Sequence, residues 1–245
     1  MRALFVCCAV VLLGAGAAAQ KNKSWTEWTA KDAQKMLLDS AWSQTQTELH
    51  DVEGSSGSAI TKAAENKRDI SDTGKNESGE NVGKSSASLS LSYSVSFLTA
   101  KPIRQAFIRL LELQNPETPT DKVAERRTFI DRDFGDYVVV TLKVGGSDRK
   151  RIGPANQEIA TADPELLKTT TYLERKDGKR VALSDFRAPA PDGMGAKLVF
   201  PRKLEGQPFI DANSGELRVI IQIGKLKLNR RFKVADMMYE GKLEY

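Results

Sequence analysis

The stretch LRVIIQIGKLKLNRRFKV, residues 217–234, alternates apolar and polar side chains on both sides of Gly224-Lys225. Such alternation is typical of half-buried strands, and a glycine-containing pair between two of them predicts a two-residue hairpin turn. In this register the apolar residues face one another across the strands, in the pairs Ile223 with Leu226, Ile221 with Leu228 and Leu217 with Phe232. The other face of the hairpin is then basic.

This basic face carries Arg218, Lys227 and Arg231. Like charges across a strand pair repel weakly, so we expect either nearby carboxylates or an anionic partner to offset them. The hypothesis for binding is weak, salt-sensitive attraction to an anionic envelope component, and an ordinary solvated face is the alternative. Arg230 interrupts the apolar face opposite Val219, so it must reach an edge or find a carboxylate.

Strand patterns recur through the second half of the chain and set the expected fold class. They cover residues 89–98, 137–144, 170–175, 180–184, 196–200 and 237–245. Asp177-Gly178 favours a two-residue type I′ turn between two of them. Helical spacing of apolar residues predicts helices near 102–114 and 121–130. We expect a mainly β, antiparallel, sandwich-like domain over 88–245 with two or three flanking helices, α+β overall.

A Trp-rich helical segment, residues 20–48, precedes this domain and holds Trp25, Trp28 and Trp42. Thr29 followed by Asp32 matches a capping box, which predicts a helix over residues 30–40. A helix this short is marginal in water. We therefore expect the tryptophans to pack on the main domain or to bind a partner.

Residues 49–87 lack aromatic side chains and contain few large aliphatic ones. Such a composition cannot bury enough apolar surface to offset the entropy of ordering, which predicts a flexible polar linker or insert. The alternative is an insertion within a hairpin, closed by a partner strand in the Trp-rich segment.

Residues 1–19, MRALFVCCAVVLLGAGAAA, have the features of a secretory signal peptide, with cleavage between Ala19 and Gln20. Cys7 and Cys8 would leave with it, so the exported chain would have no disulfide. No later apolar run is long enough for a membrane span. We expect an exported protein, periplasmic or secreted.

The motifs that carry chemistry are incomplete in this chain. GENVGKS, residues 79–85, is one residue short of a phosphate-binding loop, and Asp-Phe-Gly at 133–135 lacks the other kinase motifs. We predict no catalytic, cofactor-binding or metal-ligating residue. Carboxylate chemistry, as in a hydrolase acting on glycans, would rest on pairs among Asp131, Asp133 and Asp136.

The formal net charge of the 245 residues is +5, a mild basic bias. Outside the cytoplasm the available polyanions are lipid headgroups, anionic glycans and envelope polymers, so we expect no nucleic-acid partner. The partner would be a protein or an anionic envelope component.

Three stretches together carry a resemblance to a known group of proteins: WTEWTAKDAQKMLLDSAW (25–42), FLTAKPIRQAFIRLLELQ (97–114) and MMYEGKLEY (237–245). In these the chain resembles an uncharacterised family of bacterial secreted proteins with a Trp-containing helical N-terminal segment and a C-terminal β-rich domain. The resemblance implies a bacterial, extracytoplasmic setting and brings no activity or site residue. The function we expect is a non-enzymatic binding or structural module. A glycan hydrolase is one alternative, and a carrier with an apolar cavity between its sheets is another.

Overall fold

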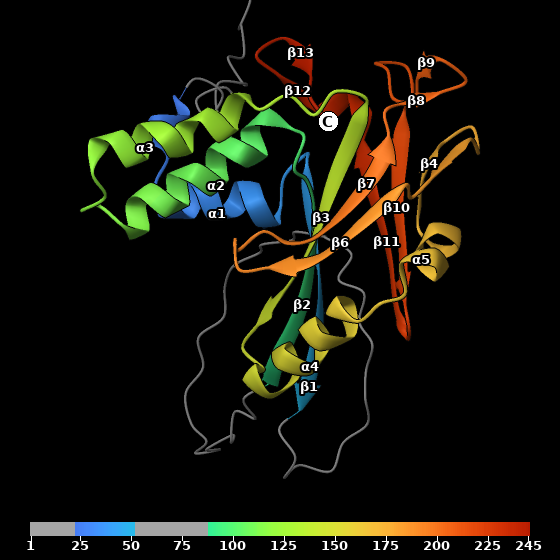
Figure 1. Cartoon of the computed structure of the whole chain (residues 1–245), viewed down its shortest axis with the longest axis horizontal. Helices are drawn as coiled ribbons and strands as arrows, with labels where there is room; N and C mark the ends of the chain where they lie inside the picture. The colour runs from blue at the N-terminus through green and yellow to red at the C-terminus, as the bar shows by residue number, and fades with distance from the viewer. Residues whose placement is uncertain (1–22, 52–87) are drawn as a thin grey trace, which may run out of the picture.

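The computed structural model describes residues 23–51 and 88–245, which form a mainly β structure in which the helices of residues 30–38, 101–114 and 120–127 lie together at one side and two later helices lie apart from them (Figure 1). The predicted signal peptide, both cysteines and most of the predicted insert lie outside these residues. The elements are, in order, η1 (Trp25–Glu27), α1 (Ala30–Leu38), β1 (Ser43–Asp51), β2 (Ser88–Phe97), α2 (Lys101–Gln114), α3 (Thr120–Arg127), η2 (Thr128–Asp131), β3 (Tyr137–Gly146), α4 (Arg149–Ala160), α5 (Pro164–Thr170), β4 (Tyr172–Arg175), β5 (Arg180–Ala182), β6 (Asp185–Ala190), β7 (Gly195–Pro201), β8 (Lys203–Leu204), β9 (Gln207–Pro208), β10 (Glu216–Ile223), β11 (Leu226–Lys233), η3 (Val234–Asp236), β12 (Met238–Tyr239) and β13 (Lys242–Leu243).

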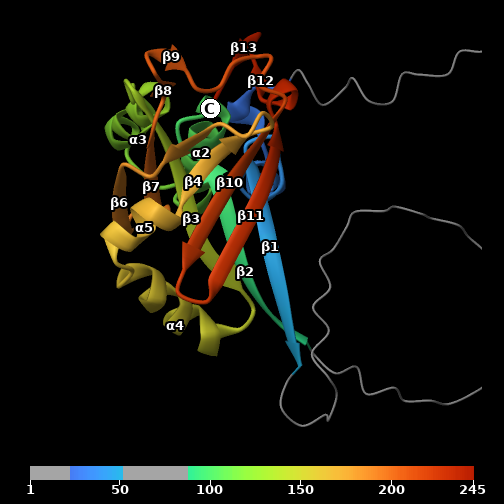
Figure 2. The same ribbon diagram turned by 90° about the vertical axis from the view of Figure 1, so that its right-hand side faces the viewer.

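Two antiparallel sheets form the expected sandwich. The five-stranded sheet A has the order β1-β2-β3-β7-β6, and the four-stranded sheet B has the order β11-β10-β4-β5. Figure 2 shows sheet B facing the viewer, with β11 beside β1 at one edge of the sandwich. There the Gln46 side chain accepts a hydrogen bond from Arg230 at 2.8 Å, so Arg230 meets an amide at the sheet edge.

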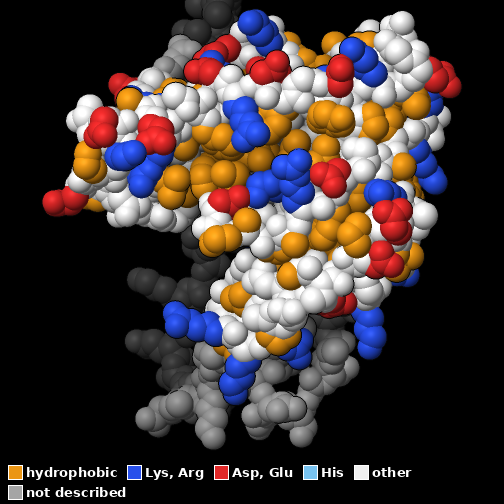
Figure 3. Space-filling view, viewed as in Figure 1, with side chains coloured by type: hydrophobic (Ala, Val, Ile, Leu, Met, Phe, Trp, Pro, Cys, Tyr) orange, Lys and Arg blue, Asp and Glu red, His pale blue; other side chains and the backbone are white. Residues whose placement is uncertain are grey.

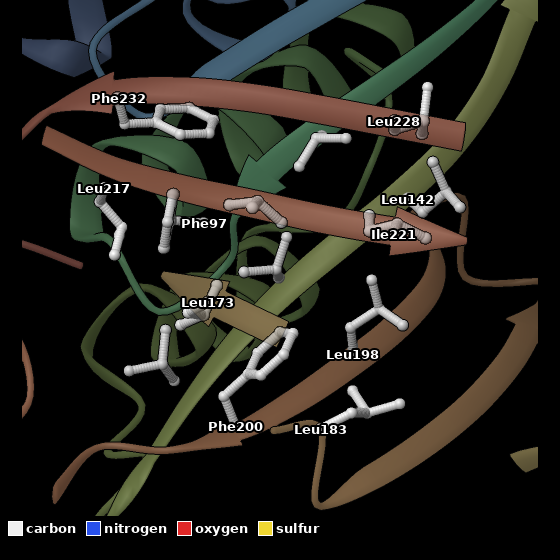
Figure 4. Close-up of a cluster of buried hydrophobic side chains, with 14 of the residues drawn as sticks. Phe97, Leu142, Leu173, Leu183, Leu198, Phe200, Leu217, Ile221, Leu228 and Phe232 are labelled. Carbon is white, nitrogen blue, oxygen red and sulfur yellow. The ribbon is translucent and has the colours of Figure 1, made fainter. Parts of the chain in front are cut away.

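The space between the two sheets is filled with apolar side chains (Figure 4). Each of the central ones is at most 1% exposed: Phe97, Leu142, Leu198 and Phe200 from sheet A, and Leu173, Leu217, Ile221, Leu228 and Phe232 from sheet B. The rings of Phe97 and Phe232 pack edge to face, with 5.0 Å between their centres. Burying one such side chain stabilises the fold by roughly 1.5 to 3 kcal/mol, so this layer holds the two sheets together.

The predicted hairpin at residues 217–234 is confirmed in strand pairing and in register. Strands β10 and β11 pair with Ile223 opposite Leu226 and Val219 opposite Arg230. The connecting turn has two residues, and only Gly224 has a positive φ, of 53°. Glycine at the first turn position is what a type II′ hairpin turn requires.

Strands β1 and β2 form a long antiparallel hairpin, from Ser43 opposite Ser96 to Asp51 opposite Ser88. The strand at Ser43–Asp51 was anticipated only by the hairpin alternative, in which a strand of the Trp-rich segment closes the insert. It extends past residue 48, so the boundary between that segment and the insert lies inside a paired strand.

Two predicted β features differ in detail from the structure. The turn after β4 holds three residues, because Arg175 N donates to Lys179 O at 2.9 Å, and Gly178 has a positive φ whereas Asp177 does not. It is therefore not the two-residue type I′ turn, and a left-handed glycine ending a three-residue loop is a common alternative. Residues 237–245 are not one strand, because Glu240-Gly241 turns them into the β12–β13 hairpin.

The helices are more numerous than the sequence patterns indicated. Helix α2 and the pair α3 and η2 occupy the predicted ranges, whereas α4 and α5 were not predicted. Both pack their apolar sides on the shared core, through Ala155 and Ile159 of α4 and Leu167 of α5. Among the described residues, no helix is long and apolar enough to cross a membrane.

Helix α1 begins with the predicted capping box and lies on the outer face of sheet A. Its last carbonyls accept hydrogen bonds from hydroxyls of β1: Ser43 Oγ donates to Leu37 O at 2.6 Å, and Thr45 Oγ1 to Leu38 O at 2.8 Å. The final carbonyls of a helix have no partner within it. The serine and threonine face of this sheet thus completes the helix end.

We expect the Asp32 carboxyl to titrate with a pKa of about 2, below its ordinary 3.8. The causes are hydrogen bonds from Thr29 N–H at 2.9 Å, from the Thr29 hydroxyl at 2.8 Å and from Lys23 at 3.2 Å. Because folding lowers this pKa, the carboxylate stabilises the fold above about pH 4, and this contribution is lost as the pH falls towards 2. An NMR titration should show the pKa rising in Thr29→Ala; an unchanged value would contradict this account.

Candidate functional site

The structure places the predicted basic side chains together on the outer face of sheet B. Glu174 of β4 forms ion pairs with Arg218 of β10 and with Arg180 of β5, the strands on either side of it. Arg231 lies 3.9 Å from Glu216, and Lys227 is exposed. Carboxylates of the same sheet therefore offset part of the charge, which was one of the two expected outcomes. Binding of an anionic partner by this face stays a prediction.

The three tryptophans lie at the N-terminal side of the structure and are packed to different degrees. Trp28 is 9% and Trp42 6% exposed, so neither offers a free surface. Trp25 is half-buried, with the Arg127 guanidinium 5.2 Å from its ring centre. Packing on the domain accounts for these contacts, and a role in partner binding stays a prediction.

The acidic residues considered for hydrolysis form separate surface contacts. Asp131 lies 3.5 Å from Lys101, and Asp133 accepts a hydrogen bond from the Gly135 N–H at 2.8 Å. Asp136 contacts Lys203 at 2.8 Å, and the hydrogen bond from this lysine lowers the pKa of the carboxyl. A general acid needs a raised pKa at neutral pH, so Asp136 does not fit that role, and the hydrolase alternative stays a prediction. The described residues contain no cluster of His, Cys, Asp and Glu that could hold a metal ion.

A hollow over the outer face of sheet A was not predicted. We call it the outer groove; it consists of two adjoining compartments that share Leu98 and Met194 in their linings. The wide compartment has a volume of 510 Å³ and the narrow one 290 Å³. Small-molecule sites usually fall between about 300 and 1,000 Å³, so the groove has the size of a ligand site.

The wide compartment lies between the η2–β3 connection and strands β6 and β7. Figure 3 shows this face, with apolar side chains gathered in the hollow and charged ones beside them. Its lining residues are Leu98, Phe129, Arg132, Asp133, Phe134, Tyr137, Val139, Ser184, Asp185, Arg187, Asp192, Met194, Lys197 and Val199. It thus combines an apolar surface with charges of both signs.

The narrow compartment lies under α1 and α2, above strands β2 and β3. It is lined by Gln34, Leu37, Leu38, Ser94, Ser96, Leu98, Ile103, Phe107, Leu110, Gln114, Thr141, Lys143, Gly193 and Met194. Lys143 is the one charged residue in this lining. The helices therefore supply mostly apolar walls that include Gln34 and Gln114, while the sheet supplies a floor of hydroxyl groups and one lysine.

The tip of the β6–β7 hairpin separates the two compartments. Gly193 has a φ of 77°, which favours glycine, and lies beside the Phe107 ring of α2. Asp192 fixes the tip by accepting hydrogen bonds from Met194 N–H at 2.9 Å and from Lys197 Nζ at 2.5 Å. Burial raises the pKa of Asp192, but these hydrogen bonds outweigh it and the net shift is downward.

The charges around the groove are unevenly balanced. In the wide compartment Lys197 pairs with Asp192, and Arg187 lies 3.2 Å from Asp185. Arg132 and Lys143 have no carboxylate within 4.0 Å among the described residues. The groove thus offers two cations that no carboxylate of the described residues neutralises, although the Arg132 guanidinium lies 5.5 Å from the ring centre of Phe134.

One sequence signal could have indicated that the outer face of sheet A is covered. Residues 137–144 are nearly continuous in apolar character, which is typical of a strand covered on both faces. The covering elements, however, come from distant parts of the chain. Sequence spacing alone could therefore not place Leu98, Phe107 and Met194 together.

No family model matches this chain, and searches of curated proteins and of solved structures likewise found no match. The resemblance to bacterial secreted proteins therefore stays an expectation. The class that the fold and the groove define is an α+β sandwich with a ligand-sized hollow outside its core.

Proposed function

We propose that this protein is a non-enzymatic binding module and that the outer groove is its ligand site. The observation that supports this proposal is a groove with mostly apolar walls and two cations that have no carboxylate partner among the described residues. The core between the two sheets, by contrast, is filled with side chains. Sites for small ligands combine such apolar walls with a few polar or charged groups that fix orientation. The ligand would therefore have an apolar body and an anionic group.

The proposed setting is outside the cytoplasm, in the bacterial periplasm or secreted. Its support is the apolar N-terminal segment 1–19, which has the features of an export signal. The carrier alternative was tied to a cavity between the sheets, where side chains instead pack closely. A carrier would therefore have to use the outer groove as well.

The proposed site can be tested with an anionic fluorescent probe, 1-anilinonaphthalene-8-sulfonate, and the purified protein. We expect binding to weaken at least tenfold in the double variant Leu110→Trp with Val199→Trp, because the larger rings fill both compartments. Leu166→Trp is the matched control, because Leu166 is 57% exposed on α5, outside the groove lining.

Circular dichroism and thermal unfolding should show that the variants keep the fold. Unchanged probe binding in a folded double variant would contradict the proposal. Absence of probe binding to the unaltered protein would contradict it too.

A further inference from the structure

We propose that the ligand is a single-chain amphiphile with one anionic head, whose chain lies in the narrow compartment and whose head contacts Lys143. The inference rests on the proposed binding role of the outer groove and specifies its ligand class. Three features of the narrow compartment support it: its walls, its floor and its single charge.

The walls are mostly apolar and come from two helices, which also contribute Gln34 and Gln114 to the lining. Leu37 of α1 faces this space together with Phe107 and Leu110 of α2. Leu110 and Phe107 are only partly buried because they face the open compartment. A ligand bound there would therefore remove apolar surface of both side chains from water. A flexible hydrocarbon chain fits a narrow space of 290 Å³ with such walls.

The floor carries hydroxyl groups, but these are already hydrogen-bonded within the protein. Ser94 Oγ lies 2.8 Å from Thr45 Oγ1, and Ser96 Oγ lies 2.6 Å from Ser43 Oγ. Thr141 Oγ1 donates to Ser96 O at 3.3 Å. The floor therefore does not require polar atoms from a ligand, which favours a hydrocarbon chain over a sugar, whose hydroxyls need partners.

The charge distribution assigns the head to Lys143. This lysine is exposed, lies on β3 opposite Ser94, and has no carboxylate in the lining around it. The wide compartment also has a free cation, Arg132, but its lining contains Asp133, Asp185 and Asp192. The three cations of that lining are thus matched by three carboxylates, whereas the lining of the narrow compartment contains Lys143 and no carboxylate, so an anion is favoured at Lys143.

Saturated fatty acids from octanoate to dodecanoate, below their micelle concentrations, provide the test by calorimetry with the purified protein. We expect affinity to rise roughly fourfold per CH₂ group until the compartment is full. Dodecanoate should bind about three- to fivefold more tightly than dodecanol, the size of an exposed ion-pair contribution, and salt should reduce the difference.

Two variants separate the head from the chain. Lys143→Gln should remove the preference for dodecanoate over dodecanol while dodecanol still binds, whereas Lys150→Gln, at an exposed position of α4 outside the groove lining, should change neither. Leu110→Trp should weaken both ligands, because the ring fills the space for the chain.

The outcomes distinguish this inference from the proposed function. If the fluorescent probe binds in the groove but fatty acids do not displace it, the groove is a ligand site and the amphiphile inference is wrong. Equal affinity for dodecyltrimethylammonium, an unchanged preference in Lys143→Gln, or displacement only by an acidic peptide would also overturn it.

Discussion

Replacing Arg104 with methionine is expected to lower the free energy of unfolding by about 3 to 5 kcal/mol, because three buried carbonyls lose their charged donor. Arg104 on α2 is 5% exposed and donates to three carbonyls: Ile130 O at 2.8 Å, Leu98 O at 3.1 Å, and Thr99 O. Hydrogen bonds from a charged donor contribute roughly 1.5 to 3 kcal/mol each. Burial lowers the pKa of Arg104, which means that burying its charge costs free energy. Removing the charge therefore offsets part of the stability lost with the hydrogen bonds.

Urea unfolding followed by tryptophan fluorescence measures this change. Arg104→Lys should lose less, because it keeps the charge, but it lacks the planar fork that reaches several carbonyls. Arg149→Met is the control, because Arg149 is exposed on α4, and such substitutions usually stay within about 0.5 kcal/mol. A loss below about 1 kcal/mol for Arg104→Met would show that the network is not needed for stability.

The same network links stability to the outer groove. Its acceptor carbonyls belong to the β2–α2 connection and to η2, and Leu98 and Phe129 from these segments line the wide compartment. The Arg104 guanidinium also lies 5.2 Å from the ring centre of Phe134, another lining residue. Arg104 therefore holds this wall of the groove without lining it.

The strongest sequence prediction was the register of the β10–β11 hairpin. Its alternation allows one pairing that places the alternating apolar side chains of both strands on the same face, and a shift of one strand by one residue would turn its apolar side chains to the opposite face. Leu217 and Phe232 are therefore opposite each other, as predicted. The shared core followed from the same reasoning, because half-buried strands must pack on a second layer.

Local patterns were insufficient where tertiary contacts decide the structure. Strand β1 is polar except for Leu49, and it forms because its backbone pairs with β2 and its hydroxyls support α1. Helix α4 contains Gly153 and Pro154, which favour a break, yet burial of Ala155 and Ile159 on the core stabilises the helix. Neither contact is encoded in a short stretch of sequence.

Trp42 connects the N-terminal segment with the far end of the chain. Its ring is in edge-to-face contact with Tyr239 at 6.0 Å, and its Nε1–H donates to Glu244 O at 2.7 Å. Glu244 in turn accepts a hydrogen bond from Lys101 N–H at 3.0 Å, at the first turn of α2. Ala100, the residue before this helix, supplies no side-chain cap, so the carboxylate of Glu244 takes that role.

Trp42→Ala is therefore expected to lower the free energy of unfolding by about 3 to 5 kcal/mol, the usual cost of removing a buried aromatic side chain. Trp42→Phe should lose about 1 to 2 kcal/mol, because it keeps most of the packing but leaves Glu244 O without its donor. Trp25→Ala is the matched comparison: Trp25 is half-buried and contacts an arginine, so its loss should stay below about 1 kcal/mol. Thermal and urea unfolding of the three variants measure these losses and rank them by size. Equal, small losses at both positions would mean that the tryptophans do not anchor the N-terminal segment, and their role would then have to lie in recognition.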